Sequence, residues 1–205
     1  MTLATKEQLY HHWKQSRIIT DERILSAFMQ VPREKFVHTD ATELAYQDHP
    51  LPIGYDQTIS QPTTVMLMIQ LLEIEQTHKV LEIGAGSGYN AAIISKLAKQ
   101  VYTIETISEL ALFAKNNIIG TQITNVEVVH QDGKQGYKPA APFQRIIVTA
   151  AATKVPKKLL SQLGNEGIMV IPVGNPYGCE MLKIHKFDHN IKTTKHGLFS
   201  FVPLV

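Results

Sequence analysis

The sequence predicts an α/β fold: a mostly parallel, doubly wound sheet with an N-terminal helical layer and a terminal antiparallel strand pair. Two observations predict it. From residue 79 onward, short apolar runs alternate with helical patterns, which is typical of a mostly parallel sheet covered on both faces. The last two apolar runs, 179–187 and 196–203, have no helical pattern between them, which predicts that they pair antiparallel. The 205 residues, 44% of them hydrophobic, suit one domain with a full core.

The first third of the chain is expected to be helical and then irregular. Residues 6–30 carry apolar side chains at spacings of three and four, and a cap near Asp21 begins a second helix that Pro32 ends. Residues 38–60 are rich in proline, glycine and polar groups, which favours a long ordered loop. The helix that follows, 63–72, is apolar on nearly every face, so we expect it to be buried.

The remaining elements form the alternating core. The expected strands are 79–83, 100–105, 125–129, 144–149, 167–173, 179–187 and 196–203. The expected helices are 88–98, 107–118 and 155–162. Residues 1–205 are therefore interpreted as a single domain, with N-terminal helices and a loop in 1–60 and the α/β core in 61–205.

A glycine turn after the strand 79–83 is the most informative feature of the chain. Gly84, Gly86 and Gly88 follow an apolar strand and open a helix, and glycines let the backbone turn tightly and let a ligand approach. A dinucleotide fingerprint would need its third glycine at position 89, where this chain has Tyr89, and no Gly-Lys-Ser/Thr sequence of a P-loop follows. With Glu82 in front, the pattern E-x-G-x-G-x-G resembles a site for S-adenosylmethionine, which carries a cationic sulfonium and no pyrophosphate.

Carboxylates at the ends of the next strands extend this prediction. Glu105 lies 105 − 84 = 21 residues beyond Gly84, close to the roughly 20 expected for a carboxylate that binds ribose hydroxyls. The alternative is that Glu105 is only a solvated strand end, but its order and spacing relative to the glycines favour the binding role. Asp132 follows the third strand and could accept from an adenine amino group. It could equally be a turn aspartate before Gly133, and its position alone leaves both open.

Composition excludes several other classes of protein. The net charge of +2 and pI of about 8.6 are too mild for a nucleic-acid-binding surface. The chain has no run of 18 apolar residues, and its N-terminus has no apolar signal core. We therefore expect neither a membrane span nor a leader. Cys179 is the only cysteine, so we expect a cytoplasmic protein in which this thiol is buried. Nine scattered histidines, without H-E-x-x-H or C-x-x-C, indicate no metal site.

The stretch 54–62, just before the buried helix, offers the short hydroxyls of Thr58 and Ser60. A helix cap and an exposed loop explain these residues as well as a functional role does. The residues alone leave that choice open.

Several segments together resemble the protein-L-isoaspartate O-methyltransferase family, in order and over nearly the whole chain. The sequence Gln-Thr-Ile-Ser-Gln-Pro at 57–62 is highly specific to that family, whereas the glycine motif marks only the wider class of S-adenosylmethionine-dependent methyltransferases. The other matching segments are 31–37, 51–54, 80–89, 132–133, 141–143, 147–151, 171–174 and 201–204.

The resemblance implies a Rossmann-like class I methyltransferase that methylates the α-carboxylate of L-isoaspartyl residues in damaged proteins. The ester then closes to a succinimide, and hydrolysis restores some normal aspartate. It implies Ser60 as the active-site residue and Thr58, Ile59 and Val202 as parts of the substrate groove. The implied cofactor-binding residues are Glu82, Gly84, Gly86, Ser87, Gly88, Glu105, Asp132 and Gly133. The implied cofactor is S-adenosyl-L-methionine, and the implied partners are isoaspartyl proteins and peptides, met by a monomer without nucleic acid or membrane.

Elementary chemistry agrees with this role of Ser60. A carboxylate is already ionised at neutral pH, so the acceptor needs no general base. Methyl transfer from a sulfonium then depends on holding oxygen, methyl and sulfur in line, which can supply roughly 7–11 kcal/mol in ideal cases. We therefore expect Ser60 to position the acceptor carboxylate by a hydrogen bond, not to act as a nucleophile.

One departure from the family keeps an alternative open. The family usually has a glycine where this chain has Asp56, and a negative charge there could repel an acidic acceptor. One alternative is therefore the same fold acting on a different carboxylate, such as a dedicated modified peptide. A second alternative, a non-catalytic cofactor-binding protein, would be favoured if Ser60 or the glycines were missing, and they are present. A nucleic-acid methyltransferase is disfavoured because its Asn/Asp-Pro-Pro-aromatic signature is missing.

Overall fold

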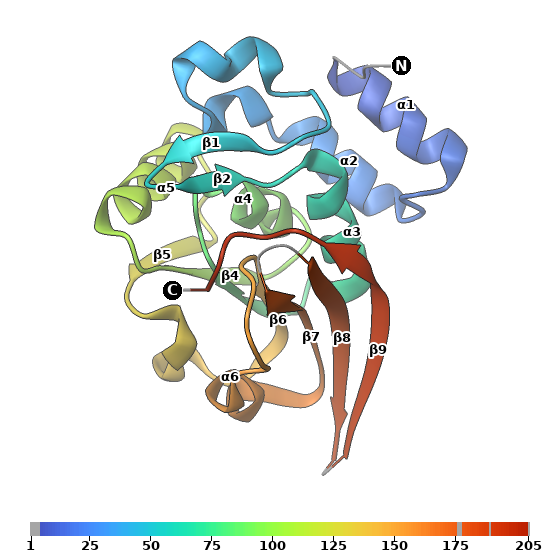
Figure 1. Cartoon of the computed structure of the whole chain (residues 1–205), viewed down its shortest axis with the longest axis vertical. Helices are drawn as coiled ribbons and strands as arrows, with labels where there is room; N and C mark the ends of the chain where they lie inside the picture. The colour runs from blue at the N-terminus through green and yellow to red at the C-terminus, as the bar shows by residue number, and fades with distance from the viewer. Residues whose placement is uncertain (1–4, 176–177, 189, 205) are drawn as a thin grey trace.

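A computed structural model describes residues 5–175, 178–188 and 190–204 of the chain (Figure 1). Its centre is a seven-stranded sheet with the strand order β5-β4-β3-β6-β7-β8-β9. The strands are β3 (Lys79–Ile83), β4 (Gln100–Glu105), β5 (Val126–His130), β6 (Phe143–Val148), β7 (Leu163–Asn175), β8 (Gly178–Phe187) and β9 (Asn190–Phe199). Strands β3 to β7 pair in parallel, and β8 runs antiparallel to both β7 and β9. The predicted parallel sheet and terminal antiparallel pair are confirmed.

The bounds of the last strand were predicted wrongly. It begins at Asn190 and ends at Phe199, not at 196–203, and Figure 1 shows β8 and β9 running side by side at one edge of the sheet. Residues 191–198 are all exposed, so this strand has no buried face to produce an apolar alternation. The apolar residues of 201–204 instead leave the sheet and cross to Ala151, with which Pro203 forms an isolated bridge.

Helices cover both faces of the sheet. They are α3 (Pro62–Leu72), α4 (Tyr89–Ser95), α5 (Ser108–Gly120) and α6 (Lys157–Gln162). Alternate side chains of a strand enter two different cores: Val80 packs with residues of α3, α4 and α5, whereas Leu81 and Ile83 pack with residues of α6. As expected, α3 is buried along most of its length. Every helix in the described ranges is too short or too polar to cross a bilayer.

The N-terminal layer consists of α1 (Lys6–Ser16), α2 (Glu22–Gln30) and the 3-10 helices η1 (Arg33–Phe36) and η2 (Thr39–Leu44). Helix α1 begins at a Thr5 capping box, and α2 begins at Asp21 and ends just before Pro32, as the sequence predicted. Trp13 joins this layer to the core, since its indole packs edge-on to Phe28 with ring centroids 4.7 Å apart and its Nε1 donates to the Thr63 hydroxyl at 2.7 Å.

The predicted loop 38–60 contains more structure than expected. Besides η2 it holds an antiparallel hairpin of β1 (Leu51–Gly54) and β2 (Gln57–Ile59), which Figure 1 shows apart from the main sheet. Tyr55 and Asp56 form its tip with φ of +55° and +56°. Residues other than glycine rarely adopt this backbone conformation, so the two residue types did not indicate a tight turn. The strands were missed because they are only four and three residues long.

Candidate functional site

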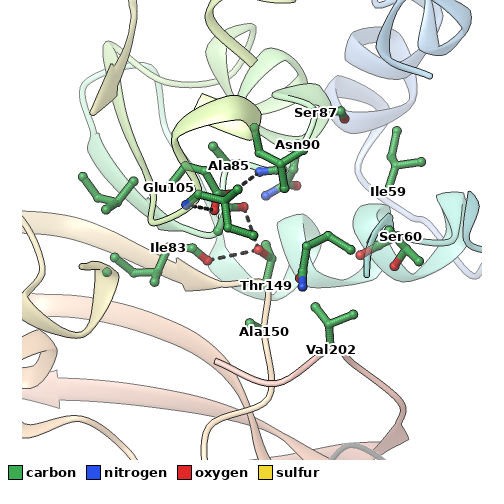
Figure 2. A pocket seen from close by; sticks show the side chains of 18 of the residues that line it. Ile59, Ser60, Ile83, Ala85, Ser87, Asn90, Glu105, Thr149, Ala150 and Val202 are labelled. Carbon is green, nitrogen blue, oxygen red and sulfur yellow. Dashed lines mark hydrogen bonds between the residues drawn. The ribbon is translucent and has the colours of Figure 1, made fainter. Parts of the chain in front are cut away.

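A cavity of about 870 Å³, counting the part open to solvent, lies at the carboxyl ends of β3, β4 and β6. The strand order reverses between β3 and β6, and in open α/β sheets such a reversal is where ligands bind. Figure 2 shows the side chains that line it. The lining comes from the β2–α3 segment, the glycine turn, the β4–α5 turn, the end of β6 and residues 202–204.

The glycine turn forms the floor of the cavity in a conformation that only glycine adopts easily. Gly84 has a φ of +96°, and a Cβ on it would lie 2.4 Å from Thr149 Oγ1. That hydroxyl donates a hydrogen bond to the backbone carbonyls of Ile83 and Gly84, at 3.0 and 2.8 Å. Gly86 has a φ of +53° and also lines the cavity. The backbone therefore lies bare at the surface where a ligand would rest.

Glu105 holds this turn in place from the end of β4. Its Oε2 accepts from the Gly86 N–H at 2.8 Å, and its Oε1 accepts from the N–H groups of Thr106 and Ile107 at 2.9 and 3.1 Å. A carboxylate has about four acceptor positions, so one remains for a ligand hydroxyl. The spacing predicted a carboxylate that binds the ribose hydroxyls, but in the fold most of its acceptor positions hold the backbone of the two loops.

The sequence predicted that Glu82 contacts the cofactor directly. In the fold, Glu82 lies behind the turn and does not belong to the described cavity lining. It is fully buried, and its Oε1 accepts from the Asn90 side-chain amide at 2.6 Å. Asn90 itself lines the cavity. Burial raises the pKa of Glu82 from 4.5 to about 7, an effect that the hydrogen bond from Asn90 opposes. Glu82 thus reaches the cavity only through Asn90.

The raised pKa of Glu82 predicts a pH-dependent loss of stability. The folded state holds the proton of the Glu82 carboxyl group more tightly than the unfolded state does. Its contribution to the free energy of unfolding is therefore complete below pH 4.5 and is lost as the pH rises through about 7. As the pH rises through this range, the free energy of unfolding of the unmodified protein should fall by on the order of 3 kcal/mol relative to that of Glu82→Gln, since a pKa unit is worth about 1.4 kcal/mol. Urea unfolding of both proteins from pH 5 to 8 measures the difference. Glu43→Gln, which removes an exposed carboxylate, is the control, and parallel curves for Glu82→Gln and the unmodified protein would refute the prediction.

Asp132 and Gly133 follow β5 and have different surroundings. The exposed Asp132 carboxylate caps the 3-10 helix η3 (Gly133–Gln135) and accepts from the Gln135 side chain and the Lys134 N–H, both at 2.9 Å. The hydrogen bond from Gln135 is the main cause that lowers the pKa of Asp132. Gly133 is buried and lines the cavity, where a Cβ would lie 2.6 Å from Ile83 Cγ2.

The structure therefore divides the predicted cofactor residues into two groups. Those that line the cavity are Gly84, Gly86, Ser87, Glu105 and Gly133. Those outside the described lining are Glu82, Gly88 and Asp132. Gly88 serves packing instead, because a Cβ there would lie 3.2 Å from the backbone oxygen of Ala114 in α5.

The four residues predicted for the acceptor side all line the same cavity: Thr58, Ile59, Ser60 and Val202. Figure 2 shows Ile59, Ser60 and Val202 on the side opposite Glu105. Val202 is fixed by the crossing of the C-terminal segment, in which the Ala151 N–H donates to the Val202 carbonyl at 2.7 Å and the Leu204 N–H to the Ala151 carbonyl at 2.8 Å.

Further residues also line the cavity. Thr149 and Ala150 directly follow β6, at a strand end where the sequence indicates a ligand site. Asn90 and Tyr89 begin α4 directly after the glycine turn, and only their distance from the glycines could have indicated them. Among the described residues, no three His, Cys, Asp or Glu side chains form a group that could hold a metal ion.

The chain is similar to known proteins over nearly its whole length. The family model Protein-L-isoaspartate(D-aspartate) O-methyltransferase (PCMT) matches residues 4–205. Curated protein-L-isoaspartate O-methyltransferases from Methanoculleus marisnigri and Methanopyrus kandleri are 43% and 46% identical to this chain, each over 98% of this chain and 91% of the relative. A crystal structure from Plasmodium falciparum, described as a beta-aspartate methyltransferase (PCMT) in complex with S-adenosyl-L-homocysteine, has a TM-score of 0.85 at 25% identity and covers 100% of this chain and 99% of its own.

Proposed function

Since this chain belongs to the protein-L-isoaspartate(D-aspartate) O-methyltransferase family, we propose which of its residues carry that activity. The enzyme transfers a methyl group from S-adenosylmethionine to L-isoaspartyl residues of damaged proteins and so initiates their repair. We assign Ser60, Thr58, Ile59 and Val202 to the acceptor and the opposite side of the cavity to the cofactor. One observation supports this assignment most: Ser60 and Glu105, from distant segments, line one cavity at the reversal of strand order.

The residues on the Glu105 side fit the cofactor. Gly84 and Gly86 line the cavity with bare backbone, and Glu105 keeps one acceptor position for a ribose hydroxyl. Ile104, Ile107 and Leu110 add an apolar surface for a flat base. When bound, S-adenosylmethionine supplies a methyl group on a cationic sulfonium. Glu82 and Asp132 support this side indirectly, the first by orienting Asn90 and the second by shaping the turn that places Gly133.

The acceptor side needs to bind and orient a group that is already reactive. The isoaspartyl carboxylate is ionised at neutral pH, so no residue has to remove a proton. The Ser60 hydroxyl can donate to one carboxylate oxygen and leave the other free for methylation. Ile59 and Val202 provide apolar walls that exclude water from this bond. Catalysis then rests on alignment of the two reactants.

Replacing Ser60 with alanine is expected to lower turnover while leaving cofactor binding unchanged. A hydrogen bond to a charged group is worth about 1.5–3 kcal/mol, which corresponds to a loss of roughly 10- to 150-fold in rate. The measurement compares transfer of a labelled methyl group to two peptides that differ only in L-isoaspartate or L-aspartate at one position. Ser161→Ala on the exposed side of α6 is the matched control. Equal losses of turnover and cofactor affinity in Ser60→Ala would contradict the positioning role.

The same assay tests a different carboxylate acceptor. Asp56 is exposed at the tip of the β1–β2 hairpin, and the next two residues, Gln57 and Thr58, line the cavity. A negative charge so close to the acceptor side favours acceptors without acidic neighbours. If neither peptide is methylated while the cofactor still binds, the acceptor is another carboxylate, and Asp56→Gly becomes the variant to test.

We further propose that residues 1–205 act as one domain, as a monomer, in the cytoplasm, with isoaspartyl proteins and peptides as partners and without nucleic acid or membrane. Three features support this. The N-terminal layer shares its core with the sheet, the single Cys179 is buried as a free thiol, and the net charge is only +2. Light scattering of the purified protein measures its molar mass and so tests whether it is a monomer.

A further inference from the structure

A buried cation lies directly behind the acceptor side of the cavity. Arg33, the first residue of η1, has no exposed surface. It does not belong to the lining of the cavity, but two residues that do, Ser60 and Tyr89, are in contact with it. Arg33 thus lies where the N-terminal layer meets both halves of the site.

The guanidinium joins three separate segments. Its Nε donates to the carbonyl of Ala45 at 2.7 Å, and its Nη2 donates to the carbonyl of Ser60 at 2.9 Å. Its Cζ lies 4.9 Å from the ring centroid of Tyr89, which begins α4 directly after Gly88. One planar group therefore connects the segment that carries Ser60 to the residue that follows the glycine turn.

The burial of this charge lowers the stability of the fold, so stability alone does not explain the arrangement. In the described part of the chain, no carboxylate lies within ion-pair distance of Arg33, and burial lowers its pKa to about 10, so it stays charged at neutral pH. Its Nη1 also lacks a hydrogen-bond partner among the described residues. A desolvated charge without a counter-charge is rarely retained for stability, because an apolar residue of similar size would cost less.

We propose that Arg33 is a positioning residue for methyl transfer, which fixes Ser60 relative to the glycine turn. The inference rests on the role of Ser60 proposed above. Only arginine can act in this way, because its rigid planar fork binds two carbonyls while the same cationic group lies over a ring. A lysine ammonium is a single point charge on a flexible chain and would hold one segment without fixing the other. The distance between acceptor and methyl donor would then vary.

Arg145 provides a matched control elsewhere in the same molecule. It is also buried, at 8% exposure, and its guanidinium donates to the carbonyls of Glu73 at 3.0 and 3.1 Å and of Gln144 at 2.8 Å. It lies near the amino end of β6, whereas the cavity is at the carboxyl ends of the strands. Arg145→Lys therefore disturbs an equivalent group of hydrogen bonds without touching the site.

The experiment compares Arg33→Lys, Arg33→Met and Arg145→Lys with the unmodified chain. The measured quantities are Tm, the Kd for S-adenosylhomocysteine, and kcat and KM for an isoaspartyl peptide. Arg33→Lys should lower kcat at least tenfold, since a misplacement of about 1 Å can cost 10²-fold, with KM and Kd within about threefold. Arg145→Lys should lower Tm by a similar amount and keep kcat within about twofold. Arg33→Met removes the desolvated charge, so it tests the same prediction should the lysine variant not fold.

The inference would be overturned by an unchanged kcat in either Arg33 variant, or by an equal loss of kcat in Arg145→Lys. A loss of kcat that follows the loss of Tm across all three variants would show a purely structural role and so overturn it as well. The unmodified chain is assayed first. If it does not methylate the isoaspartyl peptide, the acceptor assignment itself fails, and this outcome is distinct from an active enzyme that is insensitive to Arg33.

Discussion

Alanine at position 84 is expected to weaken cofactor binding strongly. The added Cβ would meet the Thr149 hydroxyl at 2.4 Å, and the φ of +96° strains any residue other than glycine. Backbone strain of this kind costs on the order of 1–3 kcal/mol, and a shift of the turn also withdraws the backbone from the ligand. We expect the affinity for S-adenosylhomocysteine to fall about 100-fold or more, which titration calorimetry measures directly.

The chain contains a matched control for this substitution. Gly120 ends α5, its φ lies outside the left-handed region, and a Cβ would meet nothing within 4 Å. Gly120→Ala should therefore leave cofactor affinity unchanged and slightly raise stability, by up to about 1 kcal/mol. An intact affinity in Gly84→Ala would show that the turn can move away from Thr149, and that it is not the rigid floor described above.

Replacement of Glu105 with glutamine is the second change with a large expected effect. The carboxylate accepts from the N–H groups of Gly86, Thr106 and Ile107, and an amide would turn one donor group toward these donors. Two loops around the cofactor side would lose their common anchor. Hydrogen bonds to a charged group are worth about 1.5–3 kcal/mol each, so we expect the affinity for S-adenosylhomocysteine to fall about 100-fold.

The control for this prediction is Glu109→Gln, in the first turn of α5. Its exposed carboxylate accepts from the Ser108 hydroxyl at 2.7 Å and does not belong to the cavity lining. This variant should bind the cofactor normally. The role of Glu105 would be wrong if Glu105→Gln lost stability but bound S-adenosylhomocysteine as tightly as the unmodified chain.

Local pattern was enough to predict where the cavity lies. The glycine turn depends on backbone conformation, which residue type reveals directly, and Glu105 lies at a spacing fixed by the length of one βα unit. Both signals are contained within about two dozen residues. The parallel core followed for the same reason, because each strand carries its own apolar run.

Features that depend on distant contacts could not be predicted in this way. The sequence shows that Glu82 is acidic and near the glycines, but only the fold shows that it is buried behind Asn90, which donates a hydrogen bond to it. Arg33 lies 27 residues before Ser60, and no local signal connects the two. Strand β9 is exposed along its length and is held by its backbone pairing with β8, which leaves no apolar period to detect.

The capping of η3 by Asp132 has a consequence for the ageing of the enzyme itself. Asp132-Gly133 is the only Asp-Gly step in the chain, which has no Asn-Gly step, and such steps isomerise readily because glycine leaves the attacking backbone nitrogen unhindered. Ring closure requires this carboxyl group to turn toward the Gly133 nitrogen, and it proceeds faster when the group is protonated. The hydrogen bonds from the Lys134 N–H and the Gln135 side-chain amide hold the Asp132 carboxylate in place. They also lower its pKa, which keeps the group ionised. In the folded enzyme, these contacts disfavour isomerisation at the one Asp-Gly step of its own sequence, which is the kind of damage that it repairs in other proteins.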